Sequence, residues 1–131
     1  MRETKAMRFV SESLATHPYE QKEENIELIV HQFIEFRNKI KDYFFPKVCN
    51  CFNVPKNHLS SSVRKREYAE ARFALMNVLR NECNLDYKTI GYLLGGKDHS
   101  TIIHGVKTHN DLVQFDKKYK QNYELLKEYL K

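Results

Sequence analysis

The fold of this 131-residue chain is decided by a short stretch that contains a double glycine. Residues 91–104 read Gly-Tyr-Leu-Leu-Gly-Gly-Lys-Asp-His-Ser-Thr-Ile-Ile-His. Gly95 and Gly96 tolerate positive φ, which suits the end of a helix, and Asp98 can cap a new helix that begins near His99. The stretch therefore predicts a helix end, a tight turn and a helix start.

Apolar residues at helical spacing flank the turn on both sides. After the turn they are Ile102, Ile103 and Val106, while the first turn of the new helix presents polar side chains. Before the turn they follow Asp86, a second candidate cap, and are Tyr87, Ile90 and Leu94. The unit is a predicted helix-turn-helix. In such elements the second helix enters the major groove of DNA, and its N-terminal residues meet the base edges.

Several segments of the chain match one family pattern. They are Ile90-Gly91, Gly95-Gly96-Lys97-Asp98-His99-Ser100-Thr101 and Ile103-His104, preceded by Arg64-Lys65-Arg66-Glu67 and Ala71-Arg72. Together they resemble the C-terminal DNA-binding domain, domain IV, of the bacterial replication initiator DnaA. The resemblance covers roughly residues 46–113. It implies a Trp-repressor-like helical domain that binds a DnaA-box-like site in double-stranded DNA, in replication initiation or its regulation.

The composition fits one ordinary globular domain with an appended helix. Hydrophobic residues make up 41% and charged residues 30%, and the period-two alternation of half-buried strands is scarce. We therefore predict an all-α fold with a long N-terminal helix. The expected division is an N-terminal segment and amphipathic helix over residues 1–45, followed by the DNA-binding domain over residues 46–131.

Helix boundaries follow from periodicity and from proline. Residues 1–21 show no sustained period and receive no function. A helix is expected over about residues 23–44, and Pro46 should end it at the preceding residue and open a short second helix. Residues 53–63 form a predicted loop. A third helix should end near Cys83 or Asn84, and Asp116 should cap the last one. The first of these helices has a seam of Ile29, Phe33, Phe36, Ile40 and Tyr43.

The resemblance implies a role for each candidate DNA-binding residue. Arg64 would enter the minor groove, and Arg72 would contact the DNA backbone. Lys97 would hold a phosphate. Tyr87 and Lys88 stand where the family tends to leucine and proline, which touch thymine methyl groups. Base edges in the major groove would meet Asp98, His99 and Ser100, with Thr101 close behind.

Each of these features also has a plainer interpretation. The run Arg64-Lys65-Arg66 can be a solvated charge cluster, and Asp98 can serve as an N-cap alone or combine both roles. His104 is expected to be a packed or hydrogen-bonded helix residue. The seam of the first helix can be an ordinary core face, or it can bind a protein partner or a second copy. A protein-interaction module or a transcriptional regulator therefore remains the alternative function.

Enzymatic, metal and membrane functions are not expected. His99, His104 and His109 are five apart, so consecutive ones lie about 140° apart around a helix and cannot converge on one metal. The cysteines form no metal-ligand set. The four glycines make no phosphate loop, so the ATPase module of an initiator is not expected in these residues, nor is a cofactor. No segment approaches the roughly 20 apolar residues of a membrane span. With a net charge of +5, the chain is expected in the cytoplasm, on the nucleoid.

Overall fold

The computed structural model describes residues 26–131 as helices joined by short connections, without a strand in that range. The elements, in order, are α2 (Ile26–Phe52), η2 (Lys56–His58), α3 (Arg66–Asn77), η3 (Val78–Glu82), α4 (Tyr87–Leu93), α5 (His99–Phe115) and α6 (Lys117–Tyr129). The all-α prediction is confirmed. The expected segment 1–21 and the first residues of the expected helix 23–44 lie outside the described residues.

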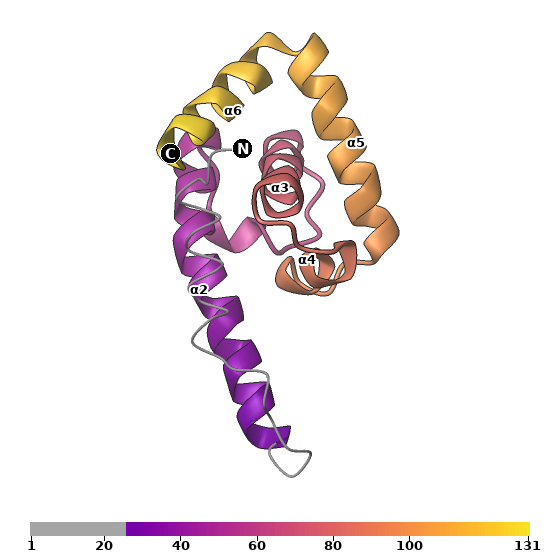
Figure 1. The fold of residues 1–131 in the computed structure, drawn as a ribbon. Coiled ribbons are helices and arrows are strands. Elements are labelled where there is room, and N and C mark those ends of the chain that lie inside the picture. Colours follow the sequence, from indigo (N-terminus) through magenta and orange to yellow (C-terminus); the bar gives the residue numbers. More distant parts are fainter. Residues whose placement is uncertain (1–25) are drawn as a thin grey trace.

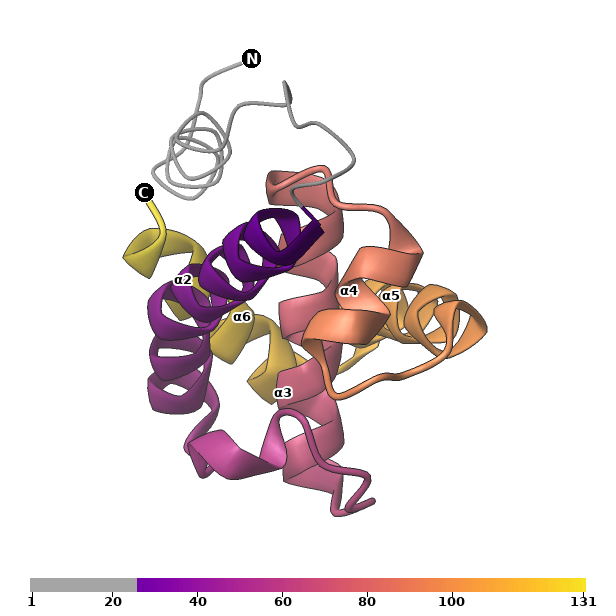
Figure 2. The same cartoon turned by 90° about the horizontal axis from the view of Figure 1, so that it is seen from below.

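Helix α3 occupies the centre of the domain (Figure 1). It packs against α2 on one side and against α5 on the other, and α6 closes the arrangement by contacting both α2 and α5. Helix α4 packs against α5, and Figure 2 shows this pair beside the other helices when the molecule is seen from below. The two helices of the predicted helix-turn-helix are thus carried by a scaffold of three other helices.

The expectation that α2 ends before Pro46 is wrong, because the helix continues through Pro46 to Phe52. Proline inside a helix costs about 3 kcal/mol, since it cannot donate a backbone hydrogen bond and its ring crowds the preceding turn. Apolar burial on both sides of Pro46 outweighs that cost: Phe44, Val48 and Phe52 are all buried, and each contributes about 1.5 to 3 kcal/mol. The separate short helix predicted after Pro46 is therefore the last part of α2, and Asn53 follows it with a φ of 55°.

The seam predicted on α2 has two different environments. Its second half lies in the core, with Phe36 and Ile40 buried. Its first half is exposed: Ile29 retains 41% and Phe33 43% of its surface. Figure 1 shows that this half of α2 projects beyond the other helices. The seam is thus a core face only where α3 and α6 lie beside it.

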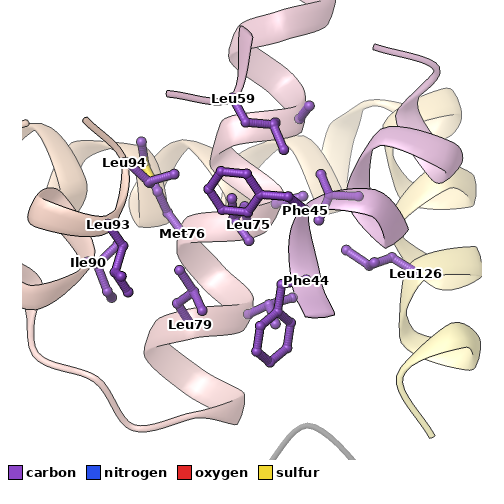
Figure 3. Packing of buried hydrophobic residues seen from close by; sticks show 14 of the residues in the cluster. Phe44, Phe45, Leu59, Leu75, Met76, Leu79, Ile90, Leu93, Leu94 and Leu126 are labelled. Atoms are coloured by element: carbon purple, nitrogen blue, oxygen red, sulfur yellow. The ribbon is translucent and has the colours of Figure 1, made fainter. Parts of the chain in front are cut away.

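The core is a single cluster of apolar side chains contributed by every long helix (Figure 3). Phe44 and Phe45 from α2 meet Leu75 and Leu79 around α3, and Leu126 enters from α6. The helix-turn-helix joins the same cluster through buried side chains of α4, the α4–α5 turn and α5, which are Ile90, Leu93, Leu94 and Ile102. Ala71 and Leu75 of α3 and Tyr119, Tyr123 and Leu126 of α6 belong to the same core, and Tyr68 is half-buried against it. The helix-turn-helix is therefore held rigidly by the core.

A glycine inside α5 has a packing explanation. Gly105 lies in the interior of α5, where glycine costs about 1 kcal/mol of helix propensity relative to alanine. A Cβ at this position would lie 2.2 Å from Sδ of Met76 on α3. The absence of a side chain therefore allows α3 and α5 to approach closely around Met76, whose side chain is buried.

A small polar network joins α6 to the rest of the core. His109 of α5 shares a hydrogen bond through Nδ1 with the hydroxyl of Tyr119, and Asn77 Nδ2 donates to the hydroxyl of Tyr123 at 2.7 Å. Burial, together with the nearby positive charge of Lys127, lowers the pKa of His109 to about 4. Burial also raises the pKa of Tyr119, so both partners are neutral in the folded protein.

This network makes the free energy of unfolding depend on pH. An unfolded histidine binds its proton near pH 6.5, whereas folded His109 does so only near pH 4. Between these values the unfolded state binds more protons, so stability falls as the pH is lowered from about 6.5 to about 4. We expect His109→Gln, which can still bond to Tyr119 but does not titrate, to lose less stability across this window in urea unfolding. Parallel pH profiles for the two proteins would contradict the assignment.

Candidate nucleic-acid interface

The turn between α4 and α5 depends on its two glycines. Gly95 has a φ of 88° and Gly96 a φ of 81°, a region that residues with side chains rarely adopt. This conformation brings two backbone N–H groups back onto one carbonyl: those of Gly96 and Lys97 donate to the oxygen of Gly91 at 3.0 and 2.8 Å. The predicted glycine turn is confirmed.

A third glycine, Gly91, allows this close approach between α4 and the segment after the turn. A Cβ at Gly91 would lie only 2.1 Å from the carbonyl oxygen of Lys97. Gly91 of helix α4 and Lys97, which precedes the cap of α5, are therefore in direct backbone contact. The angle between the two helices is set by this contact, because no side chain separates them.

Asp98 caps α5 as the sequence predicts. Its carboxylate accepts from the backbone N–H of Ser100 at 3.2 Å and from the Ser100 hydroxyl. These hydrogen bonds, chiefly the side-chain one, hold the pKa of Asp98 below its ordinary value, so it is ionised at neutral pH. Because the Ser100 hydroxyl donates a hydrogen bond to Asp98, its oxygen remains available as an acceptor. The side chains of His99, Ser100 and Thr101 are exposed at this helix start.

The first helix of the motif also begins at a cap. Asp86 accepts from the backbone N–H of Thr89 at 2.7 Å. Tyr87 is partly buried beneath the guanidinium of Arg80, whose Cζ lies 4.4 Å from the ring centroid. Lys88 is exposed. Lys88 is therefore free to reach a ligand from the solvent side, while Tyr87 is partly engaged within the protein.

A loop rich in serine and basic residues is docked against the helix-turn-helix. We define it as residues 60–65 and name it the basic loop. Lys97 Nζ donates to the carbonyl oxygen of Ser61 at 2.9 Å. The guanidinium of Arg72 donates to the carbonyl oxygen of Val63. A Cβ at Gly95 would lie 2.4 Å from the carbonyl oxygen of Ser60, so the glycine turn itself touches the loop.

The three basic residues of the predicted cluster differ in their contacts. Arg64 and Lys65 are exposed, and the ammonium of Lys65 lies 5.5 Å from the ring of Tyr68. Arg66 instead pairs with two carboxylates, those of Asp116 at 3.0 Å and Glu70 at 3.4 Å. Sequence reasoning did not anticipate this pairing, because Asp116 lies 50 residues away along the chain.

The predicted site residues divide into three groups. His99, Ser100 and Thr101 lie exposed at the start of α5, beside the ionised cap Asp98. Arg64 and Lys88 are also exposed, on the basic loop and on α4. Arg72, Lys97 and Tyr87 are engaged with other parts of the protein: Arg72 is only 8% exposed. His104 is exposed and its Nε2 shares a hydrogen bond with the hydroxyl of Thr108 at 3.4 Å, so of the two alternatives expected for it the hydrogen-bonded one is confirmed.

This geometry defines a helix-turn-helix with a polar recognition end and an adjoining basic loop, which is the construction of a DNA-binding domain. Residues 44–108 match the family described as the Bacterial dnaA protein helix-turn-helix. The chain belongs to this family.

Similar proteins carry the name chromosomal replication initiator protein DnaA. That of Bacteroides thetaiotaomicron is 29% identical over 105 residues, which are 79% of this chain and 22% of the relative. The corresponding protein of Flavobacterium psychrophilum is 29% identical over 113 residues, 82% of this chain and 24% of the relative. That of Thermomicrobium roseum is 42% identical over 59 residues, 45% of this chain and 13% of the relative. The chain thus spans less than a quarter of the length of these relatives. Within residues 26–131, no helix has the length and apolar character to span a membrane.

The contact at Gly91 can be tested by substitution. Gly91→Ala should lower the free energy of unfolding by about 3 kcal/mol or more, because the added methyl meets a backbone carbonyl that cannot rotate away. Gly96→Ala is the control. At this position the new Cβ would have open space around it, and only the positive φ is unfavourable. The substitution should therefore lower the free energy of unfolding by about 1 to 2 kcal/mol. Urea unfolding measures both, and equal losses would refute the close approach.

Proposed function

We propose that this protein binds double-stranded DNA in a sequence-specific manner at a DnaA-box-like site, in replication initiation or its regulation. The observation that carries the proposal is the placement of two separate polar elements on one scaffold. The exposed start of α5 and the exposed Arg64 belong to segments that touch at Gly95 and Ser60. Such a pair can read a major groove and the adjacent minor groove together.

The start of α5 supplies the base-reading side chains in this proposal. His99 can donate to purine acceptors, and Asp98 can accept from a cytosine amino group while it caps the helix. The Ser100 hydroxyl donates its hydrogen bond to Asp98, so its oxygen can still accept from a base. Thr101 presents both a hydroxyl and a methyl group, and the methyl suits a thymine. Tyr87 would meet the groove edge only in part, because it lies beneath Arg80.

Phosphate contacts give affinity and make it depend on salt. Lys88 is an exposed donor for this role. The backbone N–H groups of Ser100, Thr101 and Ile102 already donate to Asp98. Lys97 has three N–H donors and uses one on Ser61, so it can still face a phosphate. Arg72 is more deeply buried and would touch the backbone of the duplex only at its guanidinium edge.

Arg64 is the proposed minor-groove residue. Its side chain is exposed on the basic loop, and arginine is favoured in narrow, A·T-rich minor grooves by their negative potential. The binding site would therefore combine a few specific bases with an A·T-rich flank. The protein would act by binding alone, on the nucleoid and without catalysis.

Selection of bound duplexes from a random pool tests the function directly, because it reports binding and the preferred sequence together. An initiator-type box among the selected duplexes would support the proposal. A saturable titration that shows the same affinity for every duplex would contradict sequence-specific reading.

His99→Ala should reduce the difference in binding free energy between the selected duplex and a scrambled one by about 1 to 3 kcal/mol, because a base-edge hydrogen bond is lost. His104→Ala is the matched control, since it removes an exposed histidine from the next turns of the same helix. It should leave the difference unchanged. Fluorescence anisotropy at fixed salt measures both variants. An equal loss on the two duplexes for His99→Ala would contradict base reading.

A second candidate function is protein contact through the first half of α2. It is favoured by apolar side chains that remain 37% to 51% exposed there, namely Leu28, Ile29, Val30, Phe33 and Ile34. Exposed apolar groups in such a cluster are typical of an interaction surface. Sedimentation of the protein with and without duplex tests this candidate. A monomer at every concentration would exclude self-association.

A further inference from the structure

The basic loop has no regular secondary structure between η2 and α3, yet its backbone is held at three successive points. The carbonyl of Ser60 abuts Gly95, that of Ser61 accepts from Lys97, and that of Val63 accepts from Arg72. Two of the three partners belong to the α4–α5 turn, and the third belongs to α3. Arg64 is the residue that follows the last of these anchored carbonyls.

The two cations that hold the loop are less exposed than Arg64 and Lys88. Arg72 is 8% exposed and Lys97 is partly buried. Burial, and then the neighbouring charge of Arg72, lowers the pKa of Lys97. Two like charges in such proximity are stabilised by the carbonyl dipoles of the loop, which point toward them. A buried, hydrogen-bonded cation of this kind suits the fixing of backbone geometry.

We infer that Lys97 and Arg72 are positioning residues, which tie the basic loop to the helix-turn-helix so that Arg64 and the start of α5 engage one duplex in a fixed relation. Apart from the phosphate contacts proposed above, their effect on DNA binding passes through Arg64. Without the tie, Arg64 would sample many positions, and ordering it on the duplex would cost conformational entropy. The inference rests on the proposed function, since it names how two parts of that site are coupled.

A double-mutant cycle separates this role from an independent phosphate contact. In the wild type, Arg64→Ala should weaken binding to the selected duplex by about 5- to 150-fold, the range for loss of a specific base contact. In a Lys97→Met background, the same change should weaken binding by less than about threefold, because the loop no longer presents Arg64. Lys97 is varied rather than Arg72 because the side chain of Arg72 is buried.

Two further backgrounds serve as controls. Lys88→Met removes another lysine of the helix-turn-helix, one that is exposed. In this background Arg64→Ala should keep its full effect. Lys97→Arg retains a cationic donor for the Ser61 carbonyl, so it should restore the effect of Arg64→Ala that Lys97→Met abolishes. An undiminished effect of Arg64→Ala in the Lys97→Met background would overturn the inference.

Amide hydrogen exchange on the DNA-free protein provides a readout that does not depend on the proposed function. Lys97→Met should speed exchange in residues 60–66 by about tenfold or more, as expected for the loss of a charge-assisted hydrogen bond. Exchange in α3 and α6 should stay at the wild-type rate. Unchanged exchange in the basic loop would show that Lys97 does not hold the loop in place. If the loop loosens as expected but the wild type binds no duplex, the proposed function fails, and with it the coupling to DNA.

Discussion

The backbone contact between Gly91 and Lys97 is the constraint on which the recognition element depends. The carbonyl oxygen of Gly91 accepts from two N–H groups beyond the turn, and there is no room for a side chain between the two segments. This contact sets the direction in which α5 leaves the turn. The cap Asp98 follows one residue later, so the polar start of α5 and its place on the scaffold are fixed by neighbouring groups.

From this fixed turn the site extends outward to the basic loop. Gly95 touches Ser60, and Lys97 reaches Ser61, so the residues that form the turn also hold the loop. The helices behind the turn supply rigidity, because buried side chains of α4, the turn and α5 enter the same apolar cluster as those of α2 and α3. The interface is therefore an assembly of a short turn, a helix start and a loop, with little freedom between them.

Local features were predictable from the sequence, and contacts between distant segments were not. The caps Asp86, Asp98 and Asp116 and the glycine turn involve residues within a few positions of one another, so their residue types were enough to predict them. The passage of α2 through Pro46 depends on burial supplied by α3 and α6. The pairing of Arg66 with Asp116 and the docking of the loop carbonyls likewise depend on the tertiary fold, which composition and periodicity do not encode.

The continuity of α2 has a mechanical consequence. Its 27 residues form a rod, about 40 Å long at 1.5 Å per residue, with one end wedged into the domain and the other outside it. A partner attached to the outer end could not swing freely as it would on a flexible tether. Its orientation would be transmitted along the rod to the rest of the domain, and so to any duplex bound there.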